Sequence, residues 1–410
     1  MAEWCNLPGE LLDLISKHLD SSIDLLRFRS VCTCWRSSLH PHRSSSPSRF
    51  PILPNNGISD TTWGFYLFKR SIFFFQLPPP LFNSQSNPSW VVKIDQENPQ
   101  KCHLFNPLSR DEYKPLPPNF PKLVDFMGLR VSELGMEYTL QYINYRPFAT
   151  SIGDAGNLYS EKVAFCDVGG GGGYVILTIH VSGRLALLKS GDVKWTVIDD
   201  MPAPYDDVVF YKGSFYAVDS TGRTVMVDVG SSPVSVRFVA DSVFGGDTKM
   251  LVDGCGELFM VDKFLSVGPE DDEGFDGDEE FDYMSERTVR FEVFKLDKSG
   301  EKWIKVENLE DRIIFLGDNC AFSALASNFV GCKGNCILFT NSSKVEDGVL
   351  KSRGISVFDL ESGSIGPLAD YPGLSELFWP PPAWISSPPN LVEVSTLFTS
   401  LDANCFATSS

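Results

Sequence analysis

The sequence predicts a mainly β protein with a small helical block at its N-terminus. Apolar runs of four to eight residues recur along most of the 410-residue chain, and runs of this length rich in Val, Ile, Phe and Tyr are typical of strands. Turn clusters separate the runs, and the 33 glycines and 27 prolines argue against a helical bundle. Many short strands joined by tight turns indicate a propeller, a barrel or a sandwich.

The helical part is residues 7–39, LPGELLDLISKHLDSSIDLLRFRSVCTCWRSSL. Pro8 suits the first position of a helix, and Glu10 suits its positively polarised end. Asp20 and the two serines that follow it end this helix and begin a second one. Apolar residues spaced by three and four run along both stretches: Leu7, Leu11, Leu12, Ile15 and Leu19 in the first, and Leu25, Phe28, Cys32, Trp35 and Leu39 in the second.

This helical block is predicted to need a partner. Leu26 and Val31 lie off the apolar stripe, so the second helix is apolar on more than one face. A block of about 35 residues cannot bury enough surface to fold robustly alone. It therefore packs either on the chain's own β domain, as a helical cap, or in the groove of another protein.

The rest of the chain is a series of predicted strands with a loose repeat. Trp90, Trp195 and Trp303 each begin a β-type run, and they lie 105 and 108 residues apart. This separation is twice a propeller blade of roughly 40–50 residues, so about seven blades fit the β region, and six or eight fit nearly as well. The expected strands are 63–68, 72–75, 90–94, 174–181, 184–188, 195–198, 207–211, 214–218, 224–229, 257–261, 289–296, 336–340 and 354–360.

Composition also predicts the domain boundaries. The run GGGGG at 169–173 is expected to be a flexible hairpin loop. Ten acidic residues and no Lys or Arg lie between 270 and 286, so about 266–287 is predicted to be a disordered, solvated loop, with the attraction of a basic target as its alternative role. The predicted parts are a helical block at 1–43, a linker rich in Ser, Pro and Arg at 44–54, the β domain at 55–390 and a frayed tail at 391–410.

Charge and cysteine usage limit the partners and the compartment. With 53 acidic against 35 basic residues, the net charge is −18, and nucleic acid and anionic membranes are excluded as partners because both need a basic face. The longest apolar run, 71–82, is interrupted by three prolines, so no membrane span is expected. Ten cysteines without a disulfide framework, behind an N-terminus that lacks a signal-peptide pattern, predict reduced thiols in the nucleus and/or cytoplasm.

Candidate catalytic and metal sites are few. None of the five histidines belongs to a triad or metal motif, and Cys332 and Cys336 have no second pair of zinc spacing. Asp206 and Asp207 suggest the paired carboxylates of a propeller glycosidase, but adjacent strand residues point to opposite faces. We therefore expect no metal, no cofactor, no convergent carboxylates in a central channel and no catalysis, with a propeller enzyme as the alternative.

Two parts of the sequence resemble known families. LPGELLDLI followed by DLLRFRSVCTCWR resembles the F-box of plant proteins. Residues 204–228, 251–263 and 315–341, which include PYDDVVF and FLGDNCAFS, resemble the kelch-like domain of unknown function that follows many plant F-boxes. The resemblance implies a small helical F-box followed by a kelch-like β-propeller of about 6–8 blades.

The resemblance also implies a function. In that family the F-box docks on a Skp-family adaptor, which joins a cullin and a RING subunit, while the β domain binds a target protein for ubiquitination. The chain is then a non-catalytic adaptor for an unidentified target, and a β-propeller interaction scaffold that engages no ligase is the alternative. Cys34 stands where family members often have a basic residue, and the lost charge matters little at a mainly apolar contact. The residues expected to contact the Skp adaptor, or to form the small F-box core, are Leu7, Pro8, Leu11, Leu12, Ile15, Leu19, Leu25, Leu26, Phe28, Val31, Cys32, Trp35 and Arg36.

Overall fold

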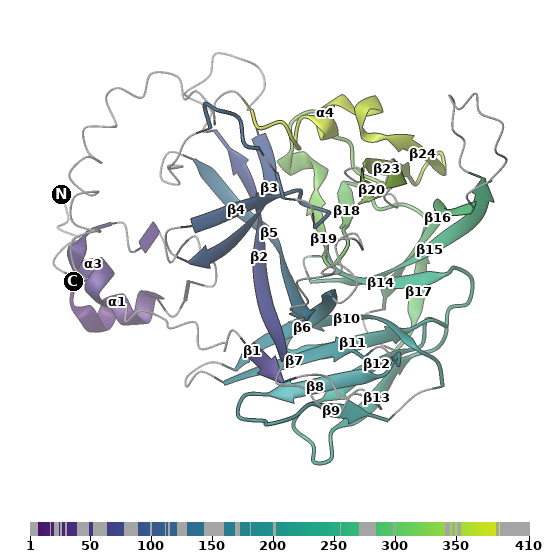
Figure 1. Cartoon of the computed structure of the whole chain (residues 1–410), viewed down its shortest axis with the longest axis horizontal. Helices are drawn as coiled ribbons and strands as arrows, with labels where there is room; N and C mark the ends of the chain where they lie inside the picture. Colours follow the sequence, from purple (N-terminus) through teal and green to yellow (C-terminus); the bar gives the residue numbers. More distant parts are fainter. Residues whose placement is uncertain are drawn as a thin grey trace.

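Most of the chain consists of strands gathered into sheets around a common centre (Figure 1). A small helical block lies beside them at the N-terminal end. The structure is a computed structural model that describes residues 7–385 except for 17, 20–23, 25–26, 29–30, 39–48, 52–63, 78–88, 99–100, 111, 114, 121–128, 143–159, 169–172, 181, 200–201, 255, 270–283, 298, 300, 341–344, 347–348, 351–353 and 383–384.

Three successive four-stranded meanders form the middle of the chain. In each, the strands pair antiparallel in sequence order. The meanders begin at residues 160, 205 and 248, and these starts, 45 and 43 residues apart, agree with the blade length predicted from the tryptophan spacing. Their strands are β6 (Ser160–Val168), β7 (Gly173–Ile179), β8 (Leu185–Lys189), β9 (Thr196–Ile198); β10 (Tyr205–Tyr211), β11 (Ser214–Asp219), β12 (Thr224–Asp228), β13 (Ser235–Ala240); β14 (Thr248–Asp253), β15 (Leu258–Pro269), β16 (Met284–Leu296) and β17 (Trp303–Val306).

The first and last sheets are less regular. The first has the order β4-β3-β2-β5, and the last has the order β19-β18-β20-β23-β24, in which β18 and β20 run parallel. Short helices follow the last sheet: η5 (Leu368–Asp370) and α4 (Pro372–Ser375), with η4 (Ala326–Asn328) inside it. The strands are β1 (Arg49–Pro51), β2 (Gly64–Gln76), β3 (Ser89–Asn98), β4 (Lys101–Phe105), β5 (Arg130–Tyr142); β18 (Arg312–Leu316), β19 (Ala321–Leu325), β20 (Cys336–Thr340), β23 (Ile355–Asp359) and β24 (Ser364–Pro367), with a separate pair β21 (Val345–Glu346) and β22 (Val349–Leu350).

The first sheet packs against the last, which closes the ring (Figure 1). The amide of Val91 donates to the carbonyl of Leu377 at 2.7 Å, and the rings of Phe74 and Phe329 meet edge to face with centroids 4.8 Å apart. One buried cluster joins side chains of β2 and β3 with side chains of β18, β19 and β20. Contact between strands more than 200 residues apart in sequence is what a closed propeller requires.

The predicted mainly β fold and its propeller arrangement are confirmed. The described strands fall into five successive groups around the ring, β1–β5, the three meanders and β18–β24, which we call its five sheets; the first two are joined edge to edge through β5 and β6, and the last two through β14 and β19. Several strands are long: β2, β5 and β16 each contain 13 residues, and β2–β5 of the first sheet extend from 64 to 142. Trp195 and Trp303 lie at the outermost strands of two alternate sheets, whereas Trp90 lies on β3, inside the first sheet.

Several local predictions differ from the structure. The two expected strands 63–68 and 72–75 form the single strand β2, and the predicted linker contains β1, whose Arg49 pairs with Tyr66. The acidic loop is shorter than predicted, because Pro269 still pairs with Met284, and its residues 270–283 lie outside the described part of the chain. The glycine run joins β6 to β7, as a hairpin loop would, and residues 169–172 are likewise not described.

A charged network is buried inside the first sheet. Lys93 and Glu137, both fully buried, form an ion pair of 2.8 Å between Nζ and Oε2. Arg70 Nη1 bonds the other carboxylate oxygen at 2.9 Å, and Lys93 Nζ also donates to the carbonyl of Ser109 at 2.6 Å. Each buried charge therefore has close partners, which burial of charge requires.

Candidate functional site

The first candidate site is the N-terminal helical block. The structure describes two of its helices, α1 (Gly9–Ser16) and α3 (Thr33–Ser38). Leu12 and Phe28 are 1% and 4% exposed and form the inside of the block, where the ring of Phe28 lies 4.5 Å from that of Trp35. Among the described residues of the block, Leu12 and Phe28 are the buried apolar side chains.

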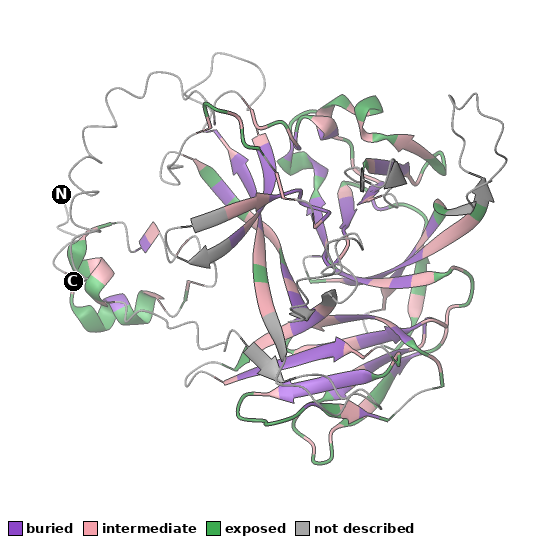
Figure 2. Cartoon of the chain, viewed as in Figure 1, coloured by how far each residue is buried: buried purple, intermediate pink, exposed green. Residues whose placement is uncertain are grey.

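Much of the same block is exposed (Figure 2), and several of its exposed residues have large apolar side chains. Leu11, Leu14, Ile15 and Val31 are 46%, 54%, 38% and 47% exposed. Four such side chains on about 30 residues form an apolar surface that the described residues leave exposed, and patches of this kind mark interaction sites. We call these four residues the exposed apolar surface of the block.

The structure places some of the predicted adaptor residues in the core of the block and others on its exposed apolar surface. Leu11, Ile15 and Val31 lie on the exposed apolar surface, whereas Leu12 and Phe28 are core residues. Leu14, which was not among the predicted residues, is exposed as well and lies three residues after Leu11 on a neighbouring part of the helix. Of the other predicted residues, Pro8 is exposed, Leu7, Leu19, Cys32, Trp35 and Arg36 are partly buried, and Leu25 and Leu26 lie outside the described residues.

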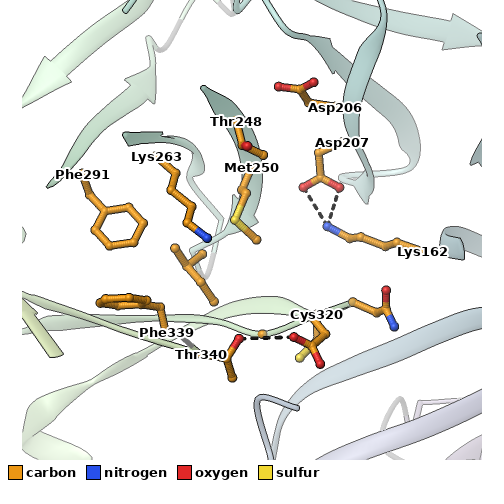
Figure 3. Close-up of a pocket in the computed structure, with 14 residues that line it drawn as sticks. Lys162, Asp206, Asp207, Thr248, Met250, Lys263, Phe291, Cys320, Phe339 and Thr340 are labelled. Carbon is orange, nitrogen blue, oxygen red and sulfur yellow. Dashed lines mark hydrogen bonds and ion pairs between the residues drawn. The ribbon is translucent and has the colours of Figure 1, made fainter. Parts of the chain in front are cut away.

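The second candidate site is a cavity of about 400 Å³ between the second, third, fourth and fifth sheets (Figure 3). Segments far apart in the sequence build it, which is why no local pattern indicated it. Its lining residues are Lys162, Asp206, Asp207, Thr248, Met250, Lys263, Phe291, Leu316, Gly317, Asp318, Asn319, Cys320, Phe339 and Thr340.

Asp206 and Asp207 both line this cavity, which contradicts the prediction from strand alternation. The reason is a β-bulge: the pairing of β10 with β11 shifts register between Tyr205 and Asp207. A bulge inserts an extra residue and turns side chains away from strict alternation. Asp318 lines the cavity as well, so the expectation that no carboxylates converge in the channel was wrong.

Asp207 holds three sheets together. One of its oxygens accepts from the amide of Leu251 on β14 at 2.8 Å, and Lys162 of β6 forms an ion pair with it at 2.6 Å. Asp206 accepts from the amide of Lys249 at 2.8 Å. Burial raises the pKa of Asp206 above its ordinary value despite this bond, and the nearby charge of Asp207 adds to the rise.

The loop 316–320 forms another wall of the cavity. The amide of Asp318 donates to the carbonyl of Leu108 at 2.8 Å, and its carboxylate accepts from the hydroxyl of Thr340 at 3.2 Å. At Gly317 a Cβ atom would lie 2.5 Å from the carbonyl oxygen of Leu108, so only glycine fits there. Burial raises the pKa of Cys320 to about 12, so its thiol stays protonated and is a poor nucleophile.

Two carboxylates of the cavity, those of Asp207 and Asp318, have structural roles. Both join sheets or loops by hydrogen bonds. Within the described residues, no group of three His, Cys, Asp or Glu side chains has the geometry to hold a metal ion. Cys332 lies in the loop before β20, and Cys336 begins that strand, with burial raising the pKa of both thiols.

The fold and both sites can now be compared with known proteins. The profile of the KIB1-4 β-propeller family matches residues 65–359. The chain belongs to the KIB1-4 β-propeller family. That match covers the five sheets up to β23 and leaves the helical block outside it.

Relatives of this KIB1-4 propeller protein extend the comparison to the helical block. F-box protein SKIP23 of Arabidopsis thaliana is 44% identical over 403 residues, which cover 94% of this chain and 96% of that protein. F-box protein At2g17036 of the same plant is 34% identical and covers 98% of this chain and 99% of its own length. The resemblance to plant F-box proteins with a C-terminal β domain is thereby confirmed.

Proposed function

We propose that this KIB1-4 propeller protein is the substrate-recognition subunit of a Skp–cullin–F-box ubiquitin ligase. The F-box binds a Skp-family adaptor and, through it, a cullin and a RING subunit, while the propeller binds a target protein. The chain contributes no catalytic group. It acts by holding the target near a charged conjugating enzyme, which raises the effective concentration of the reacting groups.

The observation that carries this proposal is the exposed apolar surface of the helical block. Leu11, Leu14 and Val31 are about half exposed in a block whose described buried apolar residues are Leu12 and Phe28. Burying a large apolar side chain contributes about 1.5–3 kcal/mol, so covering several of them supports a stable complex. The F-box names of relatives that align over nearly the whole chain support the same partner.

We also propose that the protein works in the nucleus and/or cytoplasm, without nucleic acid or membrane as a partner. The net charge of −18 repels both polyanions and anionic lipid. Cys32, Cys34, Cys166, Cys320, Cys332 and Cys336 are free thiols, which suits a reducing compartment. No described helix is long and apolar enough to cross a membrane.

The alternative is a β-propeller scaffold that engages no ligase, with the helical block as a cap on its own propeller. One contact favours this alternative: Arg27 Nη2 donates to the carbonyl of Leu129, in the propeller, at 3.3 Å. A cap would cover its apolar side chains against the sheets, whereas Leu11 and Leu14 remain exposed. The exposure therefore favours an external partner.

A pull-down with a purified Skp adaptor separates the two. We expect the full-length wild-type chain to retain the adaptor and Leu11→Asp/Leu14→Asp to lose it, because two charges would enter an apolar contact. Val193→Asp is the matched control, since Val193 is 90% exposed on the propeller. Failure of the wild type to retain the adaptor, or equal retention by the double variant, contradicts the ligase proposal.

A further inference from the structure

The cavity between the sheets contains a polar group that the protein does not satisfy. Asn319 is 5% exposed, and its Nδ2 atom is buried without a hydrogen-bond partner among the described residues. Its Oδ1 atom accepts from Arg110 Nη2 at 2.9 Å, which fixes the orientation of the amide. A buried donor without an acceptor costs free energy. A ligand that supplied an acceptor to this amide would recover that free energy.

The same cavity has an excess of negative charge. Asp206, Asp207 and Asp318 supply three carboxylates, and Lys162 and Lys263 supply two ammonium groups. Lys162 forms an ion pair with Asp207. Asp206 accepts a hydrogen bond from the backbone amide of Lys249 and has no ion pair with a described residue. Burial raises the pKa of Asp206, although the backbone amide and the charge of Lys249 lower it, so a further cation beside the carboxylate would stabilise its charged form.

An apolar wall lies across the cavity from these carboxylates. Phe291 and Phe339 lie on one side of the space and Asp206 and Asp207 on the other, with Met250 and Lys263 between them (Figure 3). The two phenyl rings meet edge to face with centroids 4.9 Å apart. A ligand that fits both sides has an apolar stem and a cationic head, as Lys and Arg side chains do.

We propose that this cavity receives a Lys or Arg side chain from an exposed segment of the target protein. The stem lies along Met250 and the phenyl rings, the cationic head meets Asp206, and a backbone carbonyl of the segment accepts from Asn319 Nδ2. The inference rests on the proposed function, because it names the chemistry by which the propeller recognises its target. The net charge of −18 also attracts basic segments over long range.

Selection from a library of random heptapeptides displayed on phage tests the inference. The immobilised full-length chain should enrich peptides with Lys or Arg at one fixed position. Asp206→Asn keeps the size of the side chain and an oxygen for the amide of Lys249, and it should reduce that enrichment at least tenfold. Asp241→Asn, at an exposed position, is the matched control and should select like the wild type.

Synthetic copies of an enriched peptide then give the affinity by fluorescence polarisation. We expect replacement of its basic residue by Gln to weaken binding at least tenfold in the wild type and much less in Asp206→Asn. n-Butylguanidinium, the free cationic head with a short stem, should bind far more weakly than the peptide. If n-butylguanidinium binds as tightly as the peptide, the cavity binds a small cation, and the proposal that it receives a side chain of the target protein is wrong.

The remaining outcomes are also decisive. The inference fails if no peptide is enriched, if acidic peptides are enriched instead, or if Asp206→Asn selects the same peptides as the wild type. Retention of the Skp adaptor by Asp206→Asn is measured in parallel. A variant that keeps the adaptor but loses peptide selection supports both proposals, whereas a wild type that keeps the adaptor without basic selectivity overturns this inference alone.

Discussion

Two adjacent leucines in α1 should respond to substitution in opposite ways. Leu12 is 1% exposed and belongs to the core of the helical block, whereas Leu11 is 46% exposed. Replacing Leu12 by Ala should cost about 2–5 kcal/mol of local stability, because it removes a buried side chain and leaves a cavity. Replacing Leu11 by Ala should leave the free block folded, because half of that side chain is already in water.

The expected effect of Leu11→Ala on adaptor binding can be calculated from the exposed half of the Leu11 side chain, which the adaptor would cover. Burying a whole leucine contributes about 1.5–3 kcal/mol, so covering half contributes about 1 kcal/mol, which is about fivefold in Kd. Leu14 and Ile15 are exposed to similar extents, 54% and 38%. The triple Ala variant at positions 11, 14 and 15 should therefore lose about 3 kcal/mol, or about a hundredfold in Kd.

Two measurements on the full-length chain separate these effects. Calorimetric titration with the Skp adaptor gives Kd, and amide hydrogen exchange gives the local stability of α1. We expect the triple variant to keep its exchange protection and lose affinity, and Leu12→Ala to lose protection, with Val193→Ala unchanged in both. The reasoning is refuted if the triple variant binds within twofold of wild type, or if it loses protection as Leu12→Ala does.

Three further predictions concern the propeller. Glu137→Ala should lower the free energy of unfolding by about 3–5 kcal/mol in urea titrations, because it leaves Lys93 buried without its carboxylate, and Lys93→Met/Glu137→Leu should recover most of that loss. Burial alone would raise the pKa of Glu137, but Lys93 and Arg70 outweigh it and hold the pKa below its usual value near 4.5. Since this pKa is depressed in the folded state, the stabilisation is complete above about pH 4.5 and is lost as the pH falls further; Glu137→Gln should flatten that part of the stability-against-pH curve, and an unchanged slope would contradict the pair's role. Trp303→Phe should cost about 1 kcal/mol, because the indole Nε1 donates to Thr224 Oγ1 of the neighbouring sheet at 3.0 Å, and an equal melting temperature would show that this bond contributes nothing.

The sequence allowed the fold class and the helical block to be predicted because both depend on local patterns. Strands such as 214–218 and 336–340 were found from short apolar runs bounded by turns, and the structure has strands there. The number of sheets was not predictable in the same way. The long strand β2 was predicted as two strands because Lys69 and Arg70 interrupt its apolar run. In the structure Arg70 is largely buried and forms an ion pair with Glu137.

The cavity could not be predicted because its residues meet only in three dimensions. Lys162, Asp207 and Asn319 come from segments that the propeller brings together across more than 150 residues of sequence. The alternation of side chains along a strand predicted that Asp206 and Asp207 point to opposite faces. The bulge that places both of them at the cavity is not indicated by any pattern in the local sequence YDDVVFY. On the helical block, sequence spacing found the apolar residues but did not separate core Leu12 from exposed Leu11.

Affinity purification from plant cells tests the ligase proposal most directly. The tagged full-length chain and its Leu11→Asp/Leu14→Asp variant are expressed with the proteasome inhibited, and co-purifying proteins are quantified by mass spectrometry. We predict that the wild type recovers a Skp adaptor with cullin and RING subunits, and that the variant loses all three together. A wild type that recovers none of them, or a variant that recovers them equally, contradicts the proposal that this propeller protein works within a ubiquitin ligase.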